Sequence, residues 1–90
     1  MYKIKPTTTF RRDLRRVQKR GCKLSLLTEI IRKLSLGEPL PEKNRDHALS
    51  GNYSTCRECH ITPDWLLIYE IVEDELILYL TRTGSHSDLF

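Results

Sequence analysis

Three histidines are the residues of this 90-residue chain best suited to catalysis near neutral pH, because imidazole changes its charge between about pH 5 and pH 8. Each histidine has an acidic residue within two positions along the chain. The pairs are His47 after Asp46, His60 near Glu58 and His86 near Asp88, and Asp64 completes the acidic set. Such a set could perform general acid–base catalysis. A histidine on a strand is more often a hydrogen-bonded structural residue, so both interpretations stay open.

Two arginines accompany the histidines in the sequence. Arg57 precedes His60, and Arg82 precedes His86 by four residues. A guanidinium group at either position could hold a phosphate. Either arginine could equally pair with a surface carboxylate.

Residues 56–60 (CRECH) match the C-x-x-C-H pattern of covalent haem attachment. Haem is rejected because its second axial ligand is missing, Met1 being the only methionine, and because the segment alternates like a strand, which points the two cysteines to opposite faces. Zinc is disfavoured because no second closely spaced ligand pair accompanies Cys56 and Cys59. We expect no metal and no cofactor, and interpret both cysteines as small packing residues.

Charge is divided unevenly between the two halves of the chain. Residues 1–36 contain eleven Lys or Arg against two acidic residues, whereas residues 37–90 contain four against ten. The first half therefore offers a positive surface to a polyanion or an acidic protein. A solvated basic helix face is the plainer interpretation. The candidate cations for binding a polyanion are Arg11, Arg12, Arg15, Arg16 and Lys19.

The length and composition fit one domain spanning residues 1–90, with 39% hydrophobic and 30% charged residues. No apolar run approaches the roughly 20 residues that cross a bilayer. Three cysteines are an odd number, which argues against a disulfide framework. We therefore expect a cytoplasmic protein.

These chemical residues must be positioned by a small number of elements. Residues 2–5 alternate like a short edge strand. Threonines at 7–9 offer N-caps for a helix to about Arg20, ended by Gly21, and a second helix is expected from about residue 23 to 36, ended by Gly37. The two helices form a hairpin.

Three strands are expected in the second half, over residues 53–61, 65–72 and 76–80, with a tight hairpin at residues 73–74. Both faces of the central strand are apolar, and two helices can cover only one face of so small a sheet. Residues 37–52, a second subunit or a protein partner must cover the other face. The predicted fold is α+β: a short N-terminal strand, a helical hairpin, and an antiparallel three-stranded meander with both helices on one face.

Four blocks of the sequence resemble the YafQ-type toxins of the RelE/ParE superfamily of bacterial type II toxin–antitoxin systems. They are residues 46–51 (DHALSG), 57–60 (RECH), 63–69 (PDWLLIY) and 82–90 (RTGSHSDLF). The blocks follow the order and spacing of that family, whereas the N-terminal helices match in pattern only. The resemblance implies a RelE-like fold and a metal-independent endoribonuclease that cleaves mRNA, mostly on the ribosome.

The resemblance also implies roles for individual residues. His86 would be the principal catalytic histidine, with His47 and His60 supporting it. Glu58, which is Asp in some relatives, and Asp64 would be the acidic members. Arg82 would stabilise phosphate, Phe90 would position a base, and Arg57 would contact RNA.

The implied partners are a co-expressed acidic antitoxin, mRNA and the ribosome, with DNA reached only through the antitoxin complex and no membrane. Two alternatives remain. The chain could be a non-catalytic relative that inhibits a protein target, as gyrase-poisoning members of the superfamily do, or a plain RNA-binding module. The histidines discriminate between these classes, because binding alone does not require both His60 and His86.

Overall fold

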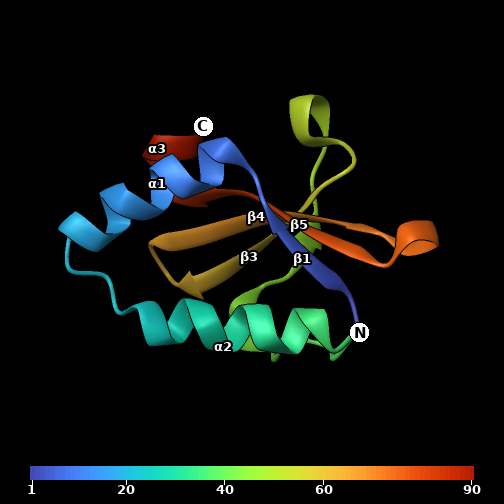
Figure 1. Cartoon of the computed structure of the whole chain (residues 1–90). Coiled ribbons are helices and arrows are strands. Elements are labelled where there is room, and N and C mark those ends of the chain that lie inside the picture. Colours follow the sequence, from blue (N-terminus) through green and yellow to red (C-terminus); the bar gives the residue numbers. More distant parts are fainter.

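Five strands form one mixed sheet in the order β1-β5-β4-β3-β2 in the computed structural model, which describes residues 1–90 (Figure 1). The strands are β1 (Lys3–Pro6), β2 (His47–Ala48), β3 (Arg57–Thr62), β4 (Trp65–Val72) and β5 (Ile77–Gly84). The helices are α1 (Thr8–Lys19), α2 (Leu24–Ser35) and α3 (His86–Leu89). The predicted α+β class and the antiparallel β3–β4–β5 meander are confirmed.

The sheet differs from the expectation at both edges. β1 pairs with β5 in parallel, so the sheet is mixed. β2 is an additional two-residue strand within the segment expected to be irregular, and it pairs with β3. A pair of residues is too short to show a strand period. β3 begins at Arg57 instead of residue 53, because residues 51–53 form a 3₁₀ turn.

Local signals explain the limits of the helices. The Thr7 side chain accepts a hydrogen bond from the Phe10 amide at 3.0 Å and caps α1. Gly21 follows α1 with a φ of 80°, a left-handed conformation that glycine adopts without steric cost. Figure 1 shows α1 running toward the short connection and α2 running back from it in the opposite chain direction, with α1 and α2 lying apart over the sheet.

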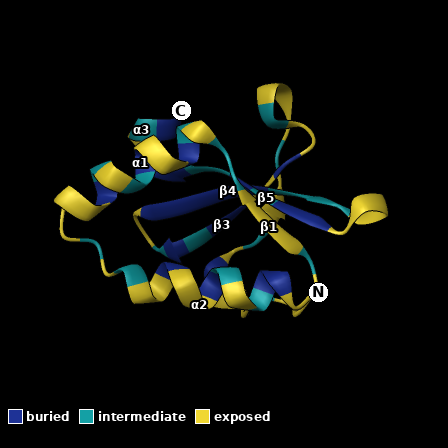
Figure 2. Cartoon of the chain, viewed as in Figure 1, coloured by how far each residue is buried: buried dark blue, intermediate teal, exposed yellow.

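Both long helices pack on the same face of the sheet. Their buried apolar residues form one cluster with the inward side chains of β3, β4 and β5. The cluster comprises Phe10, Val17, Leu27, Ile30, Leu34, Cys59, Ile61, Trp65, Leu67, Tyr69, Leu78 and Leu80. Figure 2 shows β4 as largely buried, whereas the edge strand β1 and the outer surface of α1 are largely exposed.

The opposite face of the sheet carries a smaller cluster formed by Cys56, Leu66, Ile68 and Leu89, with Leu49 and Tyr53 packed against it. The chain therefore covers this face itself, through the end of the 37–52 segment, the turn that follows it, and α3. Cys56 and Cys59 belong to different clusters, as the strand alternation predicted. No helix is both long and apolar enough to span a bilayer.

Candidate active site

One row of paired residues crosses the sheet on the face opposite α1 and α2. His47 pairs with Glu58, Glu58 pairs with Ile68, and Ile68 pairs with Arg82. Directly paired residues point to the same side of a sheet, and Ile68 belongs to the cluster on this face. The register therefore places four residues in one row across the sheet: His47, Glu58, the apolar Ile68 and Arg82.

Glu58 is the centre of the first half of the site. Its side chain is only 7% exposed, and its Oε1 atom lies 3.5 Å from His47 Nε2 and 3.8 Å from His60 Nε2. The Nδ1 atoms of the two rings contact backbone carbonyl oxygens, of Arg45 at 2.7 Å and of Pro63 at 3.3 Å.

A carbonyl oxygen can only accept a hydrogen bond, so the proton of each neutral ring resides on Nδ1. This leaves the Nε2 lone pairs of His47 and His60 facing the space beside Glu58. Two imidazole rings beside one carboxylate are an arrangement suited to general acid–base chemistry.

Arg82 forms the second half of the site. Its Nε and Nη2 atoms donate to the two carboxylate oxygens of Asp13 at 2.8 and 3.0 Å. Asp13 lies in α1, is 1% exposed, and also accepts from the Thr83 amide. The hydrogen bond with Asp13 raises the pKa of Arg82 above its already high value, and the Tyr53 hydroxyl contributes further. Because a guanidinium has five N–H groups, Arg82 keeps donors for an oxyanion after binding Asp13.

His86 is the first residue of α3, and the structure fixes this helix in two ways. The first is a capping box, in which Ser85 accepts from the Asp88 amide at 3.2 Å and donates its own amide to Asp88 Oδ2 at 2.8 Å. A Cβ atom at Gly84 would lie 2.9 Å from Asp88 Oδ2, and Gly84 has a φ of 154°. Only glycine fits this junction without strain.

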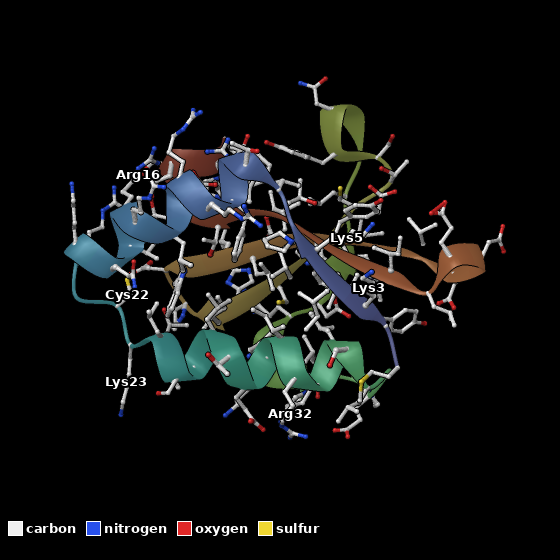
Figure 3. All side chains as sticks on the ribbon, viewed as in Figure 1. Lys3, Lys5, Arg16, Cys22, Lys23 and Arg32 are labelled. Atoms are coloured by element: carbon white, nitrogen blue, oxygen red, sulfur yellow. The ribbon has the colours of Figure 1, made fainter.

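The second support is an ion-pair clamp from α1. Arg20 donates to both carboxylate oxygens of Asp88, and Arg16 Nη1 lies 3.6 Å from Oδ1. Figure 3 shows Arg16 on α1 beside α3. The hydrogen bond from Arg20 and the Ser85 amide hold the pKa of Asp88 well below its usual range. Asp88 therefore positions α3 and does not serve as the acidic companion of His86.

Three aromatic rings surround this end of the site. The rings of His86 and Phe90 have centroids 5.0 Å apart, and Phe90 contacts Tyr53 edge-on at 5.9 Å. Phe90 is 55% exposed, so its ring remains partly accessible from solvent. Tyr53 was not among the residues selected from the sequence, and neither were Asp13 and Arg20, because their roles depend on contacts across the fold.

Several residues that the sequence predicted as site residues lie outside the group formed by Glu58, the histidines and Arg82. Arg57 pairs with Asp46 at 3.3 Å, and Asp46 also accepts from Tyr69, which belongs to the helix-side core. Asp64 is exposed in the turn between β3 and β4. The remaining selected cations of α1, all exposed, are Arg11, Arg12, Arg15 and Lys19.

Comparisons with known proteins agree with this architecture. The sequence model of the family described as "Bacterial toxin of type II toxin-antitoxin system, YafQ" matches residues 2–90. The mRNA interferase toxin YafQ of Escherichia coli K12 is 34% identical over 82 residues, which cover 90% of this chain and 87% of that protein. A metal-bound toxin from Helicobacter pylori is 42% identical over the full length of both chains, with a TM-score of 0.94. YafQ in the E. coli DinJ–YafQ complex is 32% identical, with a TM-score of 0.90, and 100% of this chain and 99% of that one are covered.

The fold and the matched sequence define the class as bacterial toxins of type II toxin–antitoxin systems. Within that class, this chain belongs to the YafQ family.

The metal in the H. pylori relative raises the question of whether this site fits one. Two imidazole nitrogens and a carboxylate oxygen around Glu58 are donors that zinc and copper accept. As positioned, however, no group of three or more His, Cys, Asp or Glu side chains is arranged to hold a metal ion. Cys56 and Cys59 cannot supply further ligands together, because they lie on opposite faces of the sheet.

Proposed function

We propose that this chain is a cytoplasmic toxin that cleaves mRNA as an endoribonuclease, mostly on the ribosome, and that a cognate acidic antitoxin neutralises it. The observation that carries the proposal is the sheet row in which Glu58, with its two histidines, and Arg82 flank Ile68. Membership of the YafQ family supports it, because the E. coli relative is named an mRNA interferase.

The proposed reaction is internal attack by the RNA. A neutral imidazole, at His60 or His47, takes the proton of the 2′-hydroxyl, and the 2′-oxygen attacks the adjacent phosphorus. Arg82 stabilises the negative charge that develops on the phosphoryl oxygens. His86, as imidazolium, gives its proton to the departing 5′-oxygen. The products are a 2′,3′-cyclic phosphate and a 5′-hydroxyl, and no metal takes part.

The other selected residues have supporting roles in this proposal. Glu58 balances the charge of the histidine that accepts the proton, and Asp64 contributes negative charge at the neighbouring turn. Phe90 stacks on a base next to the cleaved bond. The cations of α1, together with Arg57, hold the RNA or ribosomal RNA backbone.

The antitoxin is proposed to neutralise the toxin by covering these groups. In support, E. coli YafQ, which is 32% identical to this chain, assembles with DinJ in a toxin–antitoxin complex. An acidic segment would complement the exposed arginines of α1 and accelerate association.

The test is to incubate the purified chain with ribosomes translating a defined mRNA and to determine the chemistry of the new ends. Cleavage that yields 2′,3′-cyclic phosphate or 3′-phosphate ends supports the proposal. Growth arrest in cells without any RNA cleavage would favour inhibition of a protein target instead.

A further inference from the structure

A basic pocket lies beside the catalytic face, next to His60. It is a cavity of about 270 Å³ lined by Lys43, Arg45, His60 and Pro63. A second cavity of about 310 Å³ shares Lys43, His60 and Pro63 with it, so the depression continues along the turn between β3 and β4. Each is several times the roughly 30 Å³ that one water molecule occupies. The space is sufficient for a phosphate group and the chain that carries it.

The loop that supplies the two cations is anchored to β3. Asn44, between Lys43 and Arg45, is 5% exposed and donates its side-chain amide to the His60 carbonyl at 2.7 Å. The Arg45 carbonyl accepts from the His47 ring at 2.7 Å. Arg45 itself has a φ of 48°, an unusual conformation for a residue other than glycine, of a kind that concentrates at functional sites. Hydrogen bonds to the His60 backbone and the His47 ring therefore hold the loop that carries Lys43 and Arg45.

The charge of the pocket is uncompensated. No carboxylate lines it, and neither Lys43 nor Arg45 takes part in any ion pair of the structure. The nearby carboxylate of Asp46 is occupied by Arg57 and Tyr69. Two free cations and an imidazole around one cavity favour an anion.

We infer that this basic pocket binds an RNA backbone phosphate adjacent to the one that is cleaved. His60 lines the pocket and also lies 3.8 Å from Glu58, so it connects the two positions. A strand held there and at Arg82 is fixed on both sides of the histidine pair, which orients the 2′-hydroxyl. This inference rests on the proposed function, because the ligand it assigns is the RNA substrate.

The test measures binding separately from cleavage. The probe is a short RNA strand that is 2′-O-methylated throughout and so cannot be cleaved, and its Kd is measured by fluorescence anisotropy over a series of salt concentrations. Lys43→Gln with Arg45→Gln should weaken binding several-fold and reduce the slope of log K against log salt by about 0.7 for each phosphate that the protein no longer neutralises. The control is Lys3→Gln with Lys5→Gln, which removes the same charge from β1 at the opposite edge of the sheet (Figure 3). The control should keep the parent slope.

Each outcome has a distinct meaning. Equal slopes for the pocket variant and the control, with both variants folded, would overturn the pocket, and so would a parent that does not bind the strand. Unchanged RNA binding with weakened antitoxin binding would assign the pocket to an acidic antitoxin side chain and also overturn the inference. If the pocket variant has a smaller slope than the parent but the parent cuts no mRNA on ribosomes, the proposed function alone is contradicted.

Discussion

Glu58 and Arg82 lie on the same face of the sheet with only Ile68 between them. Ile68 pairs with Glu58 on β3 and with Arg82 on β5, which separates their Cα atoms by about 10 Å at the usual strand spacing. Ile68 is fully buried within the smaller apolar cluster, so apolar side chains fill the space between the two charged groups. Charges beside such an apolar cluster are screened less than in water, which strengthens their action on a phosphate.

The Arg82–Asp13 pair predicts a loss of stability as well as activity when the arginine is removed. Arg82→Gln leaves Asp13 buried without its partner, which should lower the free energy of unfolding by about 3–5 kcal/mol. Urea unfolding measures this. Adding Asp13→Asn to Arg82→Gln should restore part of the stability without restoring RNA cleavage. Full recovery of cleavage in the double variant would show that Arg82 has only a structural role.

The clamp between Arg20 and Asp88 predicts that Asp88 acts through the position of His86. Asp88→Asn should lower the rate of RNA cleavage about tenfold, and the amides of α3 should exchange faster with solvent because the ion-pair clamp and the capping carboxylate are lost. The matched control is Glu29→Gln, which breaks the exposed bidentate pair with Arg32 on α2. That variant should cleave RNA like the parent. Faster exchange at α3 with an unchanged rate would contradict the positioning role.

Asp88 also predicts how stability depends on pH. Its pKa is lower in the folded chain than in the unfolded chain, so its contribution is fully present above the unfolded value of about 3.9 and declines as pH falls toward the folded value. The difference in unfolding free energy between parent and Asp88→Asn should be constant from about pH 5 to pH 8 and shrink below about pH 4. A difference that persists undiminished at about pH 2 would contradict this assignment.

The proposed mechanism uses neither a metal nor a thiol, so we expect RNA cleavage to tolerate chelators and reductants. Burial raises the pKa of the Cys59 thiol to about 12, so it stays protonated and unreactive at neutral pH. RNA cleavage should be unchanged in EDTA with dithiothreitol, and Cys56→Ser with Cys59→Ser should remain active, although less stable. Loss of activity in EDTA that zinc or copper restores would require the group around Glu58 to be reinterpreted as a metal site.

Much of the architecture could be predicted from local sequence. The periodicity of residues 65–72 and the caps at Thr7 and Gly21 follow from neighbours in the chain. The parallel pairing of β1 with β5 joins segments more than 70 residues apart, and the alternation of Lys3–Lys5 carries no information about its partner. The two-residue β2 is likewise defined by β3 and not by its own residues.

The sequence predicted those site residues whose side-chain type alone suggests a catalytic role. The histidines, Glu58 and Arg82 were selected for that reason, and the structure brings His47, His60 and Glu58 together. Asp13 and Arg20 could not be selected, because an acidic residue within a basic helix and one arginine among many acquire their roles only through tertiary contacts. The capping role of Asp88 could not be predicted from its proximity to His86 in the sequence, because it depends on the folded turn and on Arg20.

The most direct test of the proposed mechanism concerns His86, which is exposed at the end of β5 with a ring that contacts Phe90. The measurement is the cleavage rate of a defined mRNA on purified ribosomes by the parent and by His86→Ala, with antitoxin binding and melting temperature as controls for folding. The mechanism predicts that the variant folds, binds antitoxin and RNA, and cuts about 10²–10⁴-fold more slowly, because it lacks the acid that protonates the 5′-oxygen. A folded His86→Ala protein that cleaves at the parent rate would contradict it.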